Sequence, residues 1–334
     1  MAETRTGTPS VAERIRPIDA GAPVVATHFL EKTCCFVLGE EHVLLVSDGE
    51  LRRVPVHSGG ILAVAGDSER LVTAGDDGKV VATNAQGETR TLVTDPKRRW
   101  IDRVAVGPEG AIAWSVAKTV FVQTAKRQEK TIELPSGVGG LSFAPRGFRL
   151  AVAHYNGVTL WFPNANAAPE RFEWKGSHLD VTFSPDGKFL VTAMQEPTLH
   201  GWRLADRKDL RMSGYAAKVR SLSWSHDGKW LATSGADQLV LWPFQGRDGP
   251  LGKTPKLLAP YEHPVVVVAC HPGQDVVAAG YADGMVLLVR VDDGAEILAR
   301  LPGAAPVTAL AWDASGALLA FGSEDGEAGI IDLS

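Results

Sequence analysis

A unit of about forty residues recurs along this chain of 334 residues. Each unit contains a short apolar run, a turn rich in Pro, Asp and Gly, a second apolar run, a polar turn and a third apolar run. The segment VTFSPDGKFLVTAMQEPTLHGW, which begins at Val181, shows this order clearly. Successive units are 37 to 46 residues apart, because their first runs start near Val24, Ile61, Ile101, Val138, His178, Val219, Val265 and Val307. A period of this kind restricts the fold to a repeat architecture.

The length of the unit indicates which repeat architecture to expect. Short runs that alternate apolar and polar side chains are typical of β-strands, and the repeating part shows no amphipathic helical pattern of useful length. One four-stranded blade of a β-propeller takes about 40–45 residues. We therefore predict an all-β chain that forms a single closed β-propeller of eight four-stranded blades. Seven blades are the alternative, in which residues 24–56 or 101–134 would decorate the ring, because these units have the poorest motifs.

The two ends of the chain are predicted to meet in one blade. The last unit stops at Asp332 without an outer strand, and residues 14–18, before the first unit, resemble the outer strands of other units. An N-terminal strand at this place would complete the last blade and cover an edge that could otherwise pair with another chain. Pro17 is compatible with an edge strand. We predict flexible residues 1–11 followed by a propeller domain of residues 12–334.

Several units carry the residue types of one known repeat when they are set in register. These types are His before the first strand, Ser or Thr in the second strand, Asp in the following turn and Trp at the end of the third strand. They are found at His57, Thr73, Thr192, Thr233, Asp77, Asp237, Asp283, Asp325, Trp161, Trp202 and Trp242, with Tyr215 and Tyr261 in place of His and with Asn156 and Glu196 in place of Asp. The chain thus resembles the WD40-repeat β-propeller family with degenerate repeats, and it looks like a stand-alone bacterial-type member. The resemblance implies a hydrogen-bond network inside each blade, since a buried Asp must be paired. No unit carries the complete set.

No catalytic constellation is visible, and we expect neither enzymatic activity nor a cofactor. The sequence contains no GxSxG elbow, and Ser184 belongs to a turn that recurs in the repeat. Residues 137–140 are rich in Gly but precede a strand rather than a helix, so they do not resemble a phosphate loop. A metal or small ligand in the channel of the propeller, with hydrolytic or metal-carrier activity, is the alternative function. Its candidate ligands are His154, His178, His263 and His271, which fall near strand ends.

One face of the predicted propeller collects residues suited to contact a partner. The loop Lys97-Arg98-Arg99-Trp100 precedes a first strand on this face, and Arg and Trp are enriched at interaction hot spots. A solvated loop and a nucleic-acid contact are the alternatives for this loop. The predicted partner-binding residues are Asp76, Arg98, Arg99, Trp100, Tyr155, His178, Gln195, Arg220, Tyr261 and His263. On the opposite face, the Gly/Pro-rich residues 243–255 are a second candidate for docking.

Composition narrows the class of partner. The net charge of −5 argues against duplex binding, which needs a basic excess.

The three cysteines, Cys34, Cys35 and Cys270, show no CxxC spacing. Strand alternation sends Cys34 and Cys35 to opposite faces, and we predict buried free thiols. The chain has neither a signal-peptide pattern nor an apolar run long enough to span a bilayer. We predict a cytoplasmic, monomeric, non-catalytic scaffold that binds an unidentified protein or peptide, without membrane contact.

Overall fold

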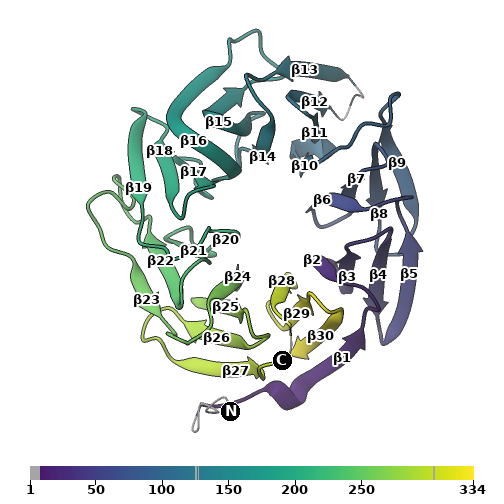
Figure 1. The fold of residues 1–334 in the computed structure, drawn as a ribbon, viewed down its shortest axis with the longest axis vertical. Coiled ribbons are helices and arrows are strands. Elements are labelled where there is room, and N and C mark those ends of the chain that lie inside the picture. The colour runs from purple at the N-terminus through teal and green to yellow at the C-terminus, as the bar shows by residue number, and fades with distance from the viewer. Residues whose placement is uncertain (1–7, 125, 127, 304) are drawn as a thin grey trace.

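In a computed structural model, which describes residues 8–124, 126, 128–303 and 305–334, antiparallel sheets stand around a common axis (Figure 1). Apart from two short 3-10 helices, η1 (Ala12–Arg14) and η2 (Pro108–Gly110), the regular elements of these residues are β-strands. The first strand of each repeat lies nearest the axis, and the later strands follow outward. The predicted all-β closed propeller is therefore confirmed.

The strands form seven hydrogen-bonded sheets. The first three sheets are β2 (Val24–Leu30), β3 (Thr33–Leu38), β4 (His42–Ser47) and β5 (Glu50–Pro55); β6 (Ile61–Gly66), β7 (Leu71–Gly75), β8 (Lys79–Thr83) and β9 (Thr89–Thr94); and β10 (Arg103–Val106), β11 (Ile112–Val116), β12 (Thr119–Gln123) and β13 (Glu129–Glu133). A six-stranded sheet follows with β14 (Val138–Phe143), β15 (Leu150–Trp161), β16 (Glu170–Phe183), β17 (Phe189–Met194), β18 (Leu199–Arg203) and β19 (Lys208–Met212). The next two are β20 (Leu222–Trp224), β21 (Trp230–Thr233), β22 (Leu239–Pro243) and β23 (Lys256–Leu258); and β24 (Val265–Cys270), β25 (Val276–Tyr281), β26 (Val286–Arg290) and β27 (Glu296–Arg300). The last sheet joins β28 (Val307–Trp312), β29 (Leu318–Ser323) and β30 (Glu327–Asp332) to β1 (Ile15–Asp19).

The predicted count of eight separate blades is too high by one, because seven sheets surround the axis. The difference lies at the fourth and fifth repeats, which share the six-stranded sheet. It does not lie at either weak unit, since residues 24–55 and 103–133 each form a complete four-stranded sheet. The eight sequence repeats are thus distributed over seven sheets.

Two long strands join the fourth repeat to the fifth. Within β15, residues 150–154 pair with β14, residues 157–160 pair with β16, and the change falls at Asn156-Gly157. Both of these residues have positive φ, at 67° and 140°, which is typical of a two-residue hairpin turn. The His154 and Thr159 side chains on either side are 2.9 Å apart, so β15 folds back on itself. Strand β16 then serves as the outer strand of the fourth repeat and, from His178, as the inner strand of the fifth.

The ends of the chain close the ring as predicted. Strand β1 is antiparallel to β30, with Ile15 opposite Ile331 and Asp19 opposite Glu327. Figure 1 shows this strand on the outer side of the last sheet. Residues 1–7 of the predicted flexible segment lie outside the described residues. Its later part contacts the neighbouring sheet, because the backbone N–H of Val11 donates to the Leu298 carbonyl oxygen at 2.9 Å. The boundary at residue 12 stays a prediction.

Apolar side chains fill the spaces between adjacent sheets. Strands β3, β7 and β17 are buried at every residue, because each lies inside a sheet that is covered on both faces. Cys34 packs toward the last sheet with Ala320, and Cys35 packs toward the second sheet with Ile61. The prediction that these thiols occupy opposite faces is confirmed. Cys270 is only half-buried.

The excursion at residues 243–255 starts inside the fold. Phe244 is buried, and its ring lies 5.2 Å from that of Phe189 and 4.6 Å from that of Trp224. Packing of this anchor therefore explains part of the segment without a partner. Docking on the rest of it stays a prediction.

Candidate functional site

Turns between second and third strands, and connections from each outer strand to the next inner strand, meet at one end of the propeller. We call this end the loop face; residues 76–78 and 95–100 are examples. The predicted partner-binding residues that are exposed there are Arg98, Arg99, Trp100, Tyr155, Gln195, Arg220 and His263, while Asp76 and Tyr261 are half-buried. Trp100 and Tyr155 expose 66% and 53% of their surface, which is unusual for large aromatic side chains.

His178 was predicted for this surface, and the structure corrects that prediction. The residue is 1% exposed, its Nδ1 lies 2.8 Å from Thr192 Oγ1, and its Nε2 lies 2.9 Å from the Trp174 carbonyl oxygen. The inner strand of the fifth repeat turns this side chain into the blade, where it pairs with Thr192 of the second strand. His178 is therefore a structural side chain.

A rigid turn presents Trp100. The Asp95 carboxylate, 6% exposed, accepts hydrogen bonds from the backbone N–H groups of Lys97 at 2.9 Å and Arg99 at 3.2 Å. It also binds the Arg99 guanidinium at 2.7 Å, and this bond holds the pKa of Asp95 below its ordinary value. Because Arg99 is used to fix the turn, the exposed side chains of Lys97, Arg98 and Trp100 are the ones in this loop that remain available to a partner.

Two hollows on the loop face flank Trp174 and together form what we call the Trp174 groove. The first hollow, of about 680 Å³, is lined by Trp174, Lys175, Ser177, Gln195, His200 and Arg211 among others. The second, of about 720 Å³, is lined by Ser136, Asn156, Arg171 and Glu173 among others. Tyr155, Trp174 and Lys175 line both hollows. The groove therefore runs from the fourth repeat to the fifth, across the six-stranded sheet.

Trp174 covers two neighbouring side chains at the floor of the first hollow. Its ring stacks on the His200 imidazole, with centroids 3.9 Å apart and an interplanar angle of 13°. The Arg211 guanidinium carbon lies 4.7 Å from the indole centroid. Since His200 and Arg211 are directly opposite in β18 and β19, one face of the sheet presents both to the same indole.

His200 is the unusual member of this cluster. The side chain is 1% exposed, yet neither ring nitrogen has a hydrogen-bond partner among the described residues. Burial is the largest cause that lowers the pKa of His200, to about 3, and the nearby His178 lowers it further. The imidazole is therefore neutral near pH 7, with one donor and one acceptor nitrogen unused.

Hydrogen-bond networks inside the blades hold the loop face in place. In the second repeat, His57 joins Asp77 through Nδ1 and Thr73 through Nε2, both at 2.9 Å. In the sixth repeat, Tyr215 replaces His, and its hydroxyl joins Thr233 Oγ1 and accepts from Trp242 Nε1, both at 2.7 Å.

The other predicted motif positions are filled less regularly. The Tyr261 hydroxyl donates to Asp283 at 2.9 Å, and Ser323 donates to Asp325 at 2.6 Å. Trp161 and Trp202 are buried as expected. Asp237, by contrast, is exposed on the loop face rather than buried in a blade network.

Comparison with protein families agrees with these networks. A family model described as "WD domain, G-beta repeat" matches residues 208–242, which include Tyr215, Thr233 and Trp242. A second, described as "Anaphase-promoting complex subunit 4 WD40 domain", matches residues 268–334. Together with the ring of sheets, these matches support a WD40-repeat β-propeller.

Curated relatives share part of this chain at low identity. Telomerase protein component 1 of Rattus norvegicus is 28% identical over 201 residues, which are 58% of this chain and 7% of that protein. Protein HIR1 of Mycosarcoma maydis is 26% identical over 330 residues, which are 82% of this chain and 32% of that protein. One of the subunits of eukaryotic translation initiation factor 3 of Xenopus laevis is 27% identical, over 47% of this chain and 23% of that protein. This WD40 chain thus spans less than a third of the length of these relatives.

A solved structure supports the ring architecture. The crystal structure of the computationally designed Ika8 protein superposes with a TM-score of 0.77 and covers 95% of this chain and 98% of that chain, at 17% sequence identity. At this identity, the similarity concerns the fold alone.

The WD40 register explains why sequence reasoning missed part of the groove. Trp174 precedes His178 by four residues, as His57 precedes Ile61, so Trp174 occupies the WD40 position of His. Lys175, His200 and Arg211 carried no motif signal, because they come from separate strands and connections. Their proximity becomes visible only from the register of β18 with β19, which puts His200 opposite Arg211.

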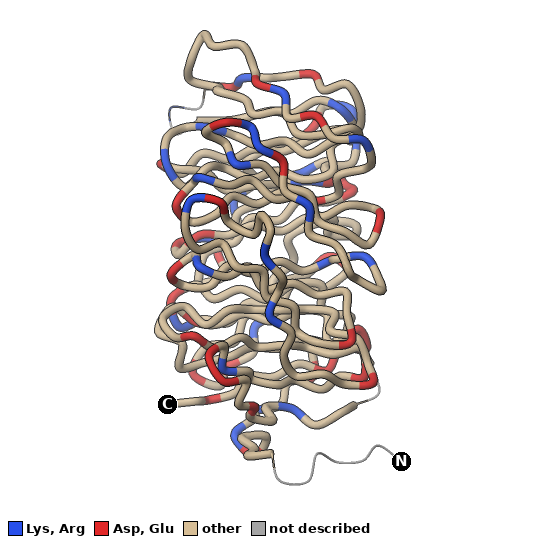
Figure 2. Tube along the Cα trace, turned by 90° about the vertical axis from the view of Figure 1, so that its left-hand side faces the viewer, with Lys and Arg blue, Asp and Glu red and all other residues tan. Residues whose placement is uncertain are grey.

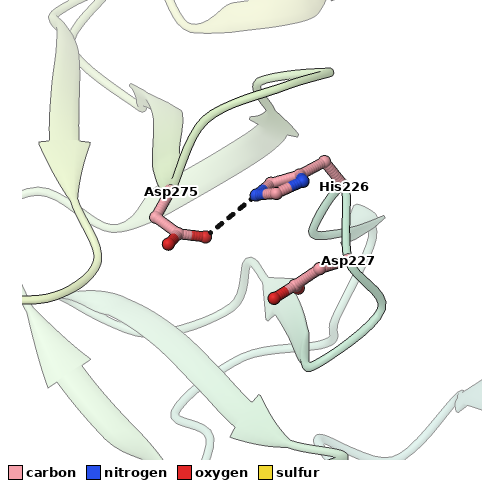
Figure 3. Close-up of side chains that lie close together, drawn as sticks. All are labelled: His226, Asp227 and Asp275. Carbon is pink, nitrogen blue, oxygen red and sulfur yellow. Dashed lines mark hydrogen bonds and ion pairs between the residues drawn. The ribbon is translucent and has the colours of Figure 1, made fainter.

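A cluster of three candidate metal ligands lies on the face opposite the loop face. Among the described residues, the group of three candidate ligands is His226, Asp227 and Asp275 (Figure 3). His226 Nε2 is 3.2 Å from an Asp275 oxygen. Asp227 already accepts from Ser225 Oγ and from the Lys229 ammonium, both at 2.8 Å, so its oxygens are engaged. The predicted ligands His154, His178, His263 and His271 are not part of this group.

No helix in the described part of the chain combines the length and the hydrophobicity that crossing a bilayer requires.

Proposed function

We propose that this protein is a non-catalytic WD40 scaffold that binds a protein or peptide partner on its loop face. The observation that carries the proposal is the Trp174 groove, which runs across two repeats and is lined by exposed and half-buried aromatic residues. Tyr and Trp supply contact area at low conformational cost, and Arg beside them is typical of interaction hot spots. The buried free thiols of Cys34 and Cys35 favour a reducing compartment such as the cytoplasm.

Relatives of the chain favour the same class of function. These relatives include a telomerase protein component and a subunit of a translation initiation factor, which are parts of larger assemblies by name. Nothing in those names extends to the partner of this chain. They support only the general role of a protein-interaction scaffold.

Charge distribution argues against nucleic acid as the main partner. Lys and Arg alternate with Asp and Glu over the side of the ring shown in Figure 2, without an extended basic stripe. A phosphate backbone would require such a stripe.

Site-specific photo-crosslinking tests the proposal. A photo-reactive amino acid at Tyr155 or Gln195, in the full chain expressed in its source cell, should form discrete crosslinked products. Crosslinks should fail at Arg146, which is exposed on the opposite face outside residues 243–255 and serves as the control. Identical products from both faces, or no product from the loop face, would contradict a loop-face scaffold.

A further inference from the structure

We propose that the first hollow of the Trp174 groove is a carboxylate pocket, which receives an Asp or Glu side chain from an extended segment of the partner. The inference deepens the proposed function and rests on it. It names the chemical group that the groove recognises.

Arg211 supplies the main attraction for a carboxylate. Its guanidinium lies against the Trp174 indole, which fixes the position of a long side chain. No hydrogen bond or ion pair joins this guanidinium to another described residue, so its donors remain available. Guanidinium donors match the two oxygens of a carboxylate, and a prepositioned guanidinium loses little entropy on binding.

His200 is an independent sign that the pocket is built for a ligand. A buried polar group without a partner costs free energy, and proteins keep few of them. The imidazole lines the first hollow, directly beside Arg211 in the neighbouring strand. In its neutral form it has one N–H donor that lacks a hydrogen-bond partner among the described residues.

The balance of charge in the first hollow also favours an anion. Lys175 and Arg211 line it, against the single carboxylate of Glu196. None of the three takes part in an ion pair with another described residue. Glu196 therefore opposes an incoming carboxylate, so its removal should strengthen binding.

The shape of the groove favours a side chain over a chain terminus. The two hollows lie on either side of Trp174 and share Tyr155, Trp174 and Lys175 in their linings, so an extended segment that crosses Trp174 can contact both. A chain that ended at the first hollow would leave the second one unfilled. We therefore assign the pocket to an internal acidic residue.

Selection from a random-peptide display library on the purified full chain tests the assignment. Selected peptides should be enriched in Asp or Glu at one internal position, and this enrichment should be absent on Arg211→Gln. The matched control is Arg146→Gln, which removes an exposed cation from the opposite face and should keep the enrichment. No enriched peptide, enrichment without an acidic residue, or enrichment that survives Arg211→Gln would overturn the proposal.

Fluorescence polarisation with a selected peptide then measures each contribution. Arg211→Gln should weaken binding by about tenfold or more, because a charge-assisted pair is lost. Glu196→Gln should tighten it, and Glu→Gln in the peptide should weaken it as much as Arg211→Gln does. His200→Phe should weaken binding severalfold without lowering the unfolding midpoint, a result that a purely structural His200 would not produce. Equal affinity for all variants would overturn the proposal.

Two further experiments are needed. They distinguish an internal carboxylate from a C-terminal one, and they distinguish failure of the carboxylate pocket from failure of the proposed scaffold function. An amidated peptide with the internal Glu should bind, and a peptide with internal Gln and a free C-terminus should not; the reverse would overturn the assignment. Binding of generic RNA in place of the peptide would overturn it as well. If the loop face forms specific crosslinks but selects no acidic peptide, only the carboxylate pocket fails.

Discussion

Buried polar side chains have two different roles in this propeller. His57 is fully paired between Asp77 and Thr73, so it links an inner-strand connection to a second strand. His200 is equally buried and has no hydrogen-bond partner among the described residues. The same residue type is therefore a stabilising link in one repeat and a cost in another. Substitutions in the paired network around His57 should therefore change stability, whereas a substitution of His200 should change binding without a loss of stability.

Replacement of Asp77 tests the paired network. Burial works to raise the pKa of Asp77, but the hydrogen bond from His57 and those from the Ser58 and Lys79 backbones lower it below 3.8. We expect Asp77→Asn to lose about 1–3 kcal/mol of unfolding free energy near neutral pH, because the charge-assisted bond to His57 is lost. Urea unfolding measures this loss.

The pH dependence of the same variant has a definite sign. A carboxyl whose pKa is lower in the folded state stabilises the protein above its unfolded pKa, and this contribution disappears as the pH falls through the folded value. The difference in stability between the parent and Asp77→Asn should therefore shrink below about pH 4. A difference that stays constant from neutral to acidic pH would contradict the assignment.

Replacement of His200 tests the unpaired side chain. His200→Phe keeps a ring against Trp174 and removes two unsatisfied nitrogens, so we expect it to raise the unfolding free energy by about 1 kcal/mol. His57→Phe, at a paired buried His, is the control and should lower it. Thermal or urea unfolding of both variants makes the comparison.

Acid should reveal the same difference. Burial, His178 and Arg211 lower the pKa of His200 to about 3, against the effect of Asp209, so the folded state resists a proton that the unfolded chain accepts below 6.5. Stability due to neutral His200 is present above that value and is lost as the pH falls toward 3. The parent should lose more stability over this interval than His200→Phe does.

At the scale of elements, the connection between the fourth and fifth repeats defines the groove. Tyr155 lies next to the turn of the β15 hairpin. Trp174 lies in β16, between its outer-strand part and the inner-strand part that begins at His178. Both elements must pass close together, which leaves no room for a side chain at Gly157. A Cβ there would lie 2.1 Å from the Phe172 carbonyl oxygen.

Gly157→Ala tests this close approach. The residue has φ +140°, so Ala would add both backbone strain and the clash with Phe172, and we expect a loss of about 2–4 kcal/mol. Gly147→Ala is the matched control, because Gly147 has φ +72° but nothing within 4 Å of a Cβ. Its loss should be about 1 kcal/mol. Equal losses in urea unfolding would show that strain alone matters.

At the scale of the whole molecule, stability depends on closure of the ring. The last sheet is completed only by β1, whose Ile18 is buried in a cluster with Phe29 and Ile330. The packing of β1 therefore joins the first repeat to the last. Without it, β30 would present an unpaired edge.

Ile18→Asp tests the closure. A buried, unpaired carboxylate should cost about 3 kcal/mol or more and release β1 from β30. We expect a lower unfolding midpoint together with concentration-dependent self-association through the exposed edge, measured by light scattering on a size-exclusion column. Arg16→Asp, at an exposed residue of the same strand, should remain close to the parent. A monomeric Ile18→Asp protein with an unchanged midpoint would contradict this account.

The starts of the repeats were predictable because they depend on local pattern. Inner strands begin at Val24, Ile61, Val138, Val265 and Val307 as the apolar runs indicated, since turn residues bound each strand within its own repeat. The network around His57 followed from the motif for the same reason. The burial of His178 was not predictable, because a first-strand residue can face either the blade or the surface.

The sequence by itself determined a closed, all-β ring of short repeats sealed by its own N-terminal strand, because periodic burial and turn chemistry are written within each unit. Only the tertiary structure decided that the fourth and fifth repeats share one sheet, and that Trp174, His200 and Arg211 meet on the loop face. Those contacts join residues of three separate strands. Their geometry depends on the register and packing of whole sheets, which no single repeat encodes.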